Sequence, residues 1–299
     1  MINNILETRF ELDRIGPFWG HIQYVENRLE TDDNRFENHV HDECEIYINL
    51  EGNVSFIVED HLYPIMPGNI IFTCPYEAHH CIYHDNSIHR HYVIRFSSEQ
   101  YTELLPTLFN RKAGTNNLIV LSKEKEQSFY SLCQRLLSIQ DCSLSYYIYF
   151  FRILDLLING TVQNDIELQV TASTIKTLKY INENIAEHIS ISQLAEQCLT
   201  SVSALERNFK KDIGTTPSKY ILERRLSLAL TYLQGNYSIL EVCEKCGFSD
   251  YSYFIACFKK RFHTTPYRYM KNKKEELKQK ENETLPLLKT TDPHSNGKI

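Results

Sequence analysis

Five side chains in the first third of the sequence have the chemistry to bind a metal ion or a polar small molecule. His39 and His41 are separated by one residue, Glu45 follows four residues later, and His79 and His80 stand further along the chain. Imidazole nitrogens and carboxylate oxygens are ligands for Fe, Mn, Zn and Ni ions. The same groups can instead form hydrogen bonds to a polar ligand in a pocket. The residue types therefore leave both kinds of site open.

A second set of chemically informative residues is basic and occurs twice. The segment FKKDIGTTPSKY begins at Phe209, and FKKRFHTTPYRY begins at Phe258. Residues 1–170 carry a net charge of −12, whereas residues 171–275 carry +6. Only this C-terminal part has the net positive charge expected of a protein that binds a polyanion. The repeat therefore indicates double-stranded DNA as the partner.

The spacing of apolar residues predicts the helices that carry the repeat. Apolar residues recur every four positions in both copies, at Leu205, Phe209 and Ile213 and at Phe254, Phe258 and Phe262. Each copy is therefore predicted to be a helix with one buried stripe. A shorter helix is expected before each copy, and this order is the helix-turn-helix plan. The alternative is a plain helical bundle with a solvated basic face, but the second basic cluster at the same offset favours DNA.

The predicted outer faces of the two longer helices supply the candidate DNA-binding residues. They are Val202, Ser203, Glu206, Arg207, Lys210 and Lys211 in the first copy, and Asp250, Tyr251, Ser252, Ile255, Lys259, Lys260 and Arg261 in the second. Arg207 can contact guanine, and Glu206 can accept a hydrogen bond from cytosine. The lysines lie one turn further on, where they would neutralise phosphates. Thr216 and Thr265 are expected to cap the helices that follow.

The first half of the chain is predicted to be mainly strands, followed by two helices. The segments CEIYINL, NVSFIVE, NIIFTC and HYVIRF are rich in β-formers and separated by turns, which suggests a sandwich or barrel. Helical periodicity follows at Phe129–Leu137 and Tyr146–Leu157. Their apolar faces would be buried either within the chain or at a dimer interface.

These patterns divide the chain into an N-terminal domain of strands and helices (1–160), a linker (161–173), a DNA-binding domain (174–274) and a disordered tail (275–299). The apolar runs are shorter than a membrane span, and the N-terminus lacks a signal-peptide layout. We therefore expect a cytoplasmic protein that has no membrane partner and no cofactor. Its nine cysteines are expected to be reduced.

The C-terminal segments ISQLAEQC, LERNFKKDIGTTPSKYI and SILEVCEKCGFSDYSYFIACFKKRFHTTPYRY resemble the AraC/XylS family of transcriptional regulators. This resemblance implies two DNA-binding lobes joined by a helix near residues 218–233, a homodimer, and contact with RNA polymerase if the protein is an activator. Two residues depart from the family pattern: Ala256, where arginine is frequent, and His263, where glycine is common. The CEKC pair, Cys243 and Cys246, matches positions that are small or apolar in the family, which favours buried thiols over a metal site.

The N-terminal residues His39, His41, Glu45 and Gly52, with a later histidine, resemble the metal-binding pattern of cupin barrels. Many regulators of the AraC/XylS family have a cupin-like sensor that keeps such polar residues. The resemblance implies that residues 1–160 form an effector-binding and dimerisation domain, so we assign His39, His41, Glu45, Tyr47, His79 and His80 to a small-molecule effector, for which a sugar or sugar derivative is suggested by analogy. The alternative is a metal-dependent cupin enzyme. The expected fold is α+β, with a cupin-like jelly-roll barrel and accompanying helices before an all-α domain of two helix-turn-helix lobes.

Overall fold

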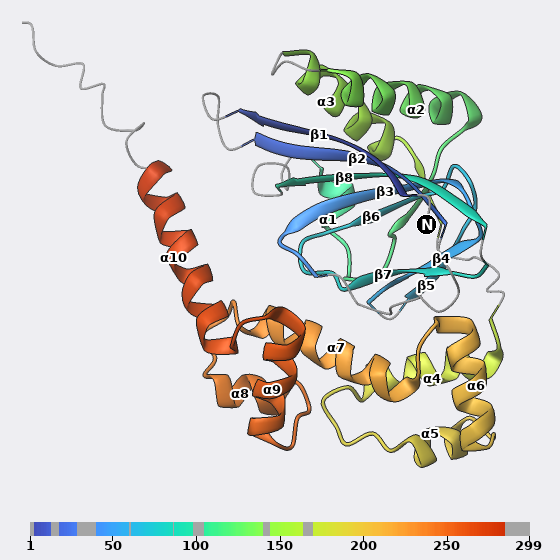
Figure 1. Ribbon diagram of the computed structural model, residues 1–299, viewed down its shortest axis with the longest axis vertical. Helices are drawn as coiled ribbons and strands as arrows, with labels where there is room; N and C mark the ends of the chain where they lie inside the picture. Colours follow the sequence, from blue (N-terminus) through green and yellow to red (C-terminus); the bar gives the residue numbers. More distant parts are fainter. Residues whose placement is uncertain are drawn as a thin grey trace, which may run out of the picture. The chain divides into compact units, whose positions relative to one another are not determined.

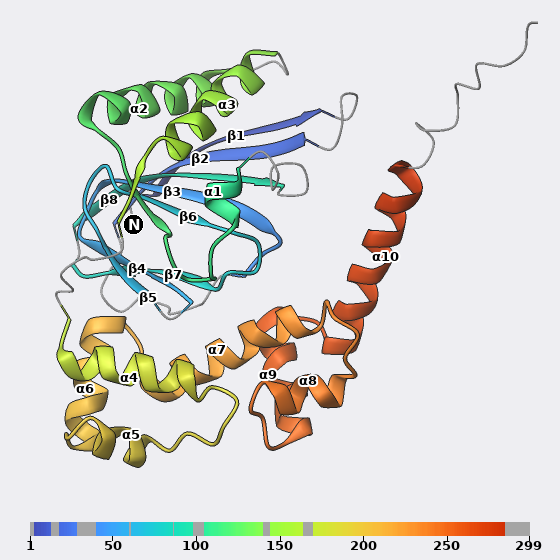
Figure 2. The ribbon, with the colours of Figure 1, turned by 180° about the vertical axis from the view of Figure 1, so that it is seen from behind.

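The computed structural model describes residues 3–12, 18–28, 40–59, 61–85, 87–97, 105–139, 144–163 and 170–284. The chain forms two compact units, residues 1–227 and residues 228–299. The first unit holds two β-sheets and the first helical lobe, and the second holds the remaining helical lobe (Figures 1 and 2). Within the described ranges, no helix is long and apolar enough to cross a membrane.

Two antiparallel sheets make up the N-terminal part of the first unit. The larger sheet has the strand order β1 (Asn3–Leu12), β2 (Phe18–Arg28), β8 (Ile88–Ser97), β3 (Glu43–Glu51), β6 (Ile70–Thr73), β9 (Leu118–Val120) and β10 (Thr161–Val162). The smaller sheet has the order β5 (His61–Ile65), β4 (Val54–Val58) and β7 (His79–Tyr83). The predicted strands CEIYINL, NVSFIVE, NIIFTC and HYVIRF are confirmed as β3, β4, β6 and β8. Strands β1, β2, β5 and β7 are not among the segments predicted from the sequence.

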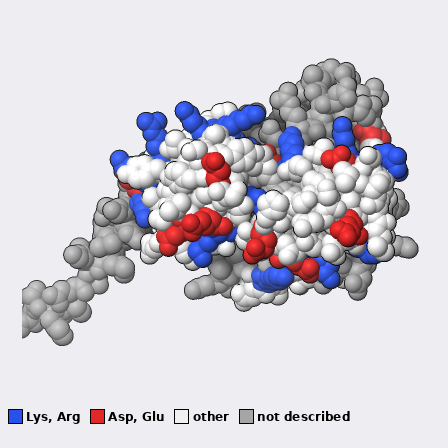
Figure 3. All heavy atoms as spheres, turned by 90° about the horizontal axis from the view of Figure 1, so that it is seen from below, with Lys and Arg blue, Asp and Glu red and all other residues white. Residues whose placement is uncertain are grey.

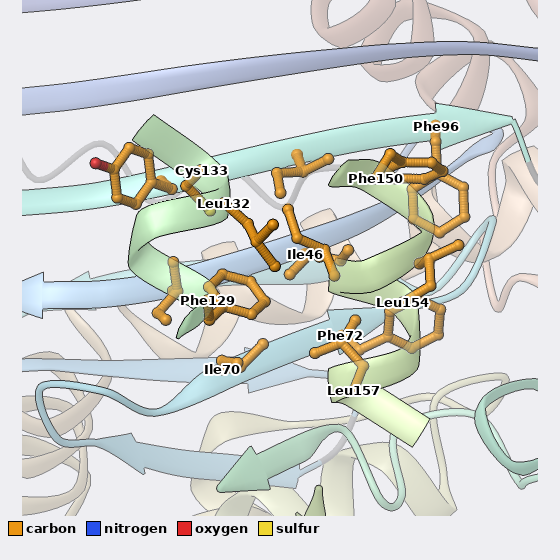
Figure 4. Close-up of a cluster of buried hydrophobic side chains, with 14 of the residues drawn as sticks. Ile46, Ile70, Phe72, Phe96, Phe129, Leu132, Cys133, Phe150, Leu154 and Leu157 are labelled. Carbon is orange, nitrogen blue, oxygen red and sulfur yellow. The ribbon is translucent and has the colours of Figure 1, made fainter. Parts of the chain in front are cut away.

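One face of the larger sheet is apolar and is covered by two helices, α2 (Lys123–Ser138) and α3 (Leu144–Ile158). Because side chains alternate along a strand, Ile46, Phe72 and Phe96 share this face and lie against Phe129 and Phe150 (Figure 4). The ring centroids of Phe96 and Phe150 are 5.1 Å apart. The inner faces of both predicted helices are therefore buried within the same chain. A short helix, α1 (Pro106–Phe109), packs at the margin of this core.

The other face of the larger sheet is more polar and presents alternating residues of β3, β6 and β8. Glu45 and Tyr47 share it with Thr73 and Arg95, since the backbone register pairs Glu45 with both Thr73 and Arg95. Apolar side chains of the smaller sheet, such as Phe56, pack against Tyr47. The polar side chains of the larger sheet therefore face the smaller sheet, where they form the site described below.

Each helical lobe repeats the same short helix, turn and longer helix. The first contains α4 (Ala172–Glu183), α5 (Ile191–Gln197), α6 (Val202–Ile213) and α7 (Pro217–Tyr232), and the second contains α8 (Ile239–Lys245), α9 (Tyr251–Phe262) and α10 (Pro266–Thr284). Leu205, Phe209 and Phe258 are buried, as the apolar spacing predicts. The side chains of Thr216 and Thr265 accept hydrogen bonds from the amides three residues later, which confirms both as caps.

Two predicted segments differ from the structure. The tail was expected to be disordered from residue 275, but α10 continues to Thr284, since its first turns follow Pro266 without a helix-breaking residue. That part of the prediction is wrong, and residues 285–299 lie outside the described residues. The predicted linker begins with Thr161–Val162, which pairs with β9 as the edge strand β10. Its residues 164–169 are not described, and Thr171 already caps α4.

The ends of α6 and α9 differ in one residue that matters for stability. Both helices end in a left-handed residue, Gly214 with φ of 80° and His263 with φ of 56°. A non-glycine residue in the left-handed conformation costs roughly 1–2 kcal/mol. Glycine avoids this strain, but it loses more backbone entropy on folding, which offsets part of the gain. We predict that His263→Gly raises the free energy of unfolding of the second lobe by about 0.5–1 kcal/mol. Thermal unfolding would show the gain as a higher midpoint, and an unchanged or lower midpoint would contradict it.

Candidate functional site

The first candidate site is the Glu45 cluster, which consists of His41, Glu45, His79 and Arg95. Glu45 and Arg95 are neighbours across β3 and β8, and His41 lies just before β3. His79 begins β7 in the smaller sheet. The cluster therefore joins side chains of both sheets on their facing sides.

The Glu45 carboxylate is the centre of this cluster. Its Oε2 accepts a hydrogen bond from Arg95 Nε at 2.8 Å and lies 3.3 Å from His41 Nε2. Its Oε1 lies 3.5 Å from His79 Nε2. The Glu45 and His79 side chains are 7% and 3% exposed, whereas those of His41 and Arg95 are 18% and 35% exposed. Solvent can thus reach the cluster on the side of His41 and Arg95.

Electrostatics favour the charged forms of Glu45 and His79. Burial alone would raise the pKa of Glu45, but His79, His41 and Arg95 together hold it well below its ordinary value. Burial alone would lower the pKa of His79, but the Glu45 carboxylate raises it above the ordinary value. A buried carboxylate that stays ionised can bind a cation or accept hydrogen bonds from a polar ligand.

The predicted effector residues are only partly brought together. His41, Glu45 and His79 meet, and Tyr47 shares the inner face of β3, where its ring packs on Phe56 with centroids 4.5 Å apart. His80 is adjacent to His79 in β7, so it lies on the opposite face of that strand. His39 is outside the described residues.

Sequence reasoning left Arg95 out of the effector set because nothing near it in sequence marks it as a partner of Glu45. The signal was available only through strand pairing, which aligns the two residues across 50 positions of sequence. Gly52, in contrast, has a local role. Its φ is +113°, and a Cβ there would lie 2.2 Å from His89 Nδ1, so the turn between β3 and β4 requires glycine.

Among the described residues, the group that could hold a metal ion is His41, Glu45 and His79, whose ligand atoms all lie within 4.8 Å of one another. Cys243 and Cys246 are both buried, and the Cys243 thiol lies 3.6 Å from the Phe248 carbonyl oxygen, to which it donates. Within the described part of the chain, these cysteines belong to no group of three or more metal-ligating residues. The reading of CEKC as packed thiols fits this arrangement.

The second candidate site is the outer surface of the longer helix in each lobe. On α6 the predicted residues are all exposed: Val202, Ser203, Glu206, Arg207, Lys210 and Lys211. On and beside α9, Asp250, Tyr251, Ser252, Lys259 and Lys260 are exposed, whereas Ile255 and Arg261 are half-buried. Ser201 and Asp250 cap the two helices, because their side chains accept hydrogen bonds from Ala204 N and Tyr253 N. The carboxylate of Asp250 therefore has a structural role at the start of α9.

The basic side chains of α6 and α9 lie in the last turn of each helix. Figure 3 shows Lys and Arg side chains at several places around one face of the molecule, with acidic side chains between them. Lys210 and Lys211 lie in the last turn of α6, and Lys259, Lys260 and Arg261 lie in the last turn of α9. Two short basic clusters at the same helical position can each contact a phosphate backbone.

Comparisons with known proteins match both parts of the chain. Residues 27–142 match the AraC-like ligand binding domain, and residues 194–272 match a helix-turn-helix domain. The HTH-type transcriptional activator RhaS of Escherichia coli O6:H1 is 25% identical over 81% of this chain and 89% of its own length. RhaS of Mannheimia succiniciproducens is 23% identical over 77% of this chain and 88% of its own length.

An AraC-type regulator from Chromobacterium violaceum is 34% identical, and the match covers 33% of this chain and 88% of that one with a TM-score of 0.31.

Proposed function

Because this chain belongs to the AraC/XylS family of transcriptional regulators, we propose that its two lobes together recognise one operator. A polar small molecule bound at the Glu45 cluster would change the affinity for that DNA. The observation that carries the proposal is the pair of capped helices, α6 and α9, each with an exposed outer face and a basic last turn. A helix of this kind fits the major groove of DNA.

On the DNA, some side chains of the two lobes would contact bases, and others would contact phosphates and position the protein. Arg207 is exposed on α6 and can make two hydrogen bonds to guanine, and Glu206 beside it can accept one from cytosine. Lys210 and Lys260 would contact phosphates, which fix the register without reading sequence. Since Ile255 and Arg261 are half-buried, the first lobe would contribute more to base recognition than the second.

The effector would act by favouring one of two arrangements of the DNA-binding lobes. Such a shift requires that the effector bind the two arrangements with different affinity. We propose a homodimer as the acting form, supported by the exposed apolar side chains Leu144, Ile148 and Phe151 on α3. Acting in the cytoplasm, the protein would contact RNA polymerase if it is an activator. A sugar-like effector stays a prediction based on analogy.

The alternative of a metal-dependent enzyme has less support. The two RhaS relatives are transcriptional activators and align with 81% and 77% of this chain, and the two matched domains, at residues 27–142 and 194–272, span both candidate sites. We therefore propose regulation of transcription, without catalysis, as the function. A metal ion at the Glu45 cluster would be compatible with this proposal, since a bound ion can take part in ligand recognition without turnover.

The direct test is DNA binding by fluorescence anisotropy. The full chain would be titrated against the promoter region of its own gene and against a shuffled duplex, at two salt concentrations. We expect a preference of about 10³ or more for the native duplex, with affinity that falls steeply in salt. Equal affinity for both duplexes, with and without candidate sugars, would contradict sequence-specific regulation at that promoter.

Two substitutions separate base reading from phosphate contact. Arg207→Ala should weaken binding to the native duplex by about 1–3 kcal/mol and relax the preference at one base position. Lys260→Ala should weaken native and shuffled duplexes alike and reduce the salt slope by about one. Lys179→Ala, on α4, removes the same charge from a side chain that is 74% exposed and serves as the control. If Arg207→Ala and Lys260→Ala have the same effect on both duplexes, the assignment of Arg207 is wrong.

A further inference from the structure

The longer helices of the two lobes have the same layout but carry different chemistry. Helices α6 and α9 each have 12 residues, follow a capping side chain and end in a left-handed residue. Position by position, Glu206 of α6 therefore corresponds to Ile255 of α9, and Arg207 corresponds to Ala256. The fifth and sixth positions of the helix hold a charged pair in the first lobe and an apolar pair in the second.

The first two turns of α9 lack the side chains that read bases by paired hydrogen bonds. Residues 251–258 have the sequence YSYFIACF, which contains no Arg, Lys, Asn, Gln, Asp or Glu. Those side chains make the bidentate contacts to guanine and adenine, or accept a hydrogen bond from cytosine. Asp250 precedes the helix, but its carboxylate accepts the capping hydrogen bond from Tyr253 N at 2.7 Å. Only hydroxyl groups, such as that of Ser252, are left at this end of α9 to form hydrogen bonds with base edges.

The apolar residues of α9 adjoin the part of the helix that we assign to phosphate contact. Tyr251 and Ala256 are exposed, and Ile255 between them in sequence is half-buried. Residues three or four apart are neighbours on a helix, so Ile255 lies next to both Tyr251 and Lys259. Lys259 is exposed in the basic last turn. An apolar surface is therefore continuous with the basic surface on the same side of α9.

We propose that the second lobe recognises thymine, by contact of Ile255 and Ala256 with C5-methyl groups in the major groove. The thymine methyl is the apolar group among the base edges that this groove presents. Over a G·C pair, the same side chains would cover the guanine acceptors and the cytosine amino group without giving them partners, which costs free energy. The first lobe, with Arg207 and Glu206, would read G·C pairs. This inference rests on the proposed DNA-binding function and adds to it the base preference of the second lobe.

The test replaces thymine by deoxyuridine, which removes the methyl group and keeps the base pair. The full chain would select its preferred duplexes from a random pool, and each thymine of the selected site would then be replaced singly. Fluorescence anisotropy should show a loss of affinity of about fourfold at the positions that α9 reads, which corresponds to the burial of one methyl group. Ile255→Ala should abolish this loss, whereas Arg207→Ala should weaken binding but keep the same sensitivity to deoxyuridine.

Ala256→Arg tests the inference in the opposite direction. Ala256 is exposed, so the longer side chain does not disturb the core, and arginine is the residue that α6 has at the same position. This variant should select guanine at a position where the unmodified protein selects thymine. Because the expected result is a gained preference, a failure to fold cannot produce it. Lys179→Ala, at a position of α4 that is 74% exposed, is the control and should select the same site as the unmodified protein.

Three results would overturn the thymine preference and leave the DNA-binding function standing. These are a selected site defined by G·C pairs alone, deoxyuridine substitutions that leave affinity unchanged, and undiminished sensitivity to deoxyuridine in Ile255→Ala. Selection of no preferred sequence would instead contradict the proposed function itself, and this inference with it. The two failures are thus distinguished by the selection step, which precedes any substitution of thymine.

Discussion

Arg111→Met should lower the free energy of unfolding of the N-terminal sheets by about 3–5 kcal/mol, which is the cost of breaking a buried ion pair. Arg111 and Glu77 side chains are 3% and 4% exposed. The guanidinium binds the carboxylate through two nitrogens, with distances of 2.6 Å from Nη2 to Oε2 and 2.7 Å from Nη1 to Oε1. Methionine fills much of the volume but leaves the Glu77 carboxylate buried without its counter-ion.

The cost is expected to be large because the pair belongs to a network. Glu77 also accepts hydrogen bonds from the amides of Cys74 and Gly114, and Arg111 donates to the carbonyl oxygens of Leu108 and Thr115. Burial alone would lower the pKa of Arg111, but Glu77 raises it above the ordinary value. Arg111 therefore stays charged in the folded chain, and its removal leaves the buried Glu77 side chain without its ion-pair partner.

Urea unfolding measured by circular dichroism would quantify the loss. The double variant Glu77→Gln/Arg111→Met should recover part of it, since no buried charge is left. Lys123→Met is the control, because Lys123 is 87% exposed and its ion pair with Glu126 should contribute less than about 1 kcal/mol. A loss below about 1 kcal/mol in Arg111→Met would show that the pair contributes no more than a surface ion pair.

This network also supports the Glu45 cluster. The carbonyl oxygen of Glu77 accepts the hydrogen bond that orients the His79 ring, and the Glu77 carboxylate is held by Arg111. Variants that break the ion pair should therefore disturb ligand binding at Glu45 as well as stability. His79, a residue of the proposed effector site, is thus oriented by a segment that a buried ion pair outside the cluster holds in place.

Residues of the site that lie close together in the sequence were easier to predict than residues that meet only in the folded chain. His41 lies just before β3 and Glu45 lies near its start, so the short spacing along the sequence already places the two side chains close together. Arg111 and Glu77 are separated by 34 residues, and neither lies in a pattern that identifies the other. Arg111 follows α1 and Glu77 follows β6. The two residues meet only because the folded chain brings these two segments together.

The helical lobes were easier to predict because the same apolar spacing and the same Thr-Thr-Pro segment occur in both. Leu205 and Phe254, each at the start of an apolar stripe, are buried as expected, and Thr216 and Thr265 cap the helices that follow. Asp250 shows the limit of this reasoning. Its position on the outer side of the helix start suggested contact with bases, but a carboxylate at that position is also the usual cap of a helix, and Asp250 accepts from Tyr253 N at 2.7 Å.

The second large effect is expected from Phe258→Ala in the second lobe. Phe258 is fully buried, and its ring lies 5.9 Å from that of Phe254, 4.6 Å from Phe262 and 6.0 Å from Tyr269, measured between centroids. Removal of a buried phenylalanine side chain costs about 3–5 kcal/mol. A unit as small as residues 228–299 has little stability to lose, so this substitution should unfold much of the lobe.

Unfolding of the second lobe should then reduce specific DNA affinity while the N-terminal sheets stay intact. Hydrogen exchange would report the loss of amide protection in α8 and α9, and anisotropy with the native duplex would report the loss of affinity. Tyr267→Ala removes an aromatic side chain from the same lobe at a position that is 61% exposed, and should change stability by less than about 0.5 kcal/mol. If Phe258→Ala kept full protection of α9 and full DNA affinity, the aromatic core would not be what holds the second recognition helix in place. If protection were lost but affinity kept, the first lobe with Arg207 would carry recognition alone.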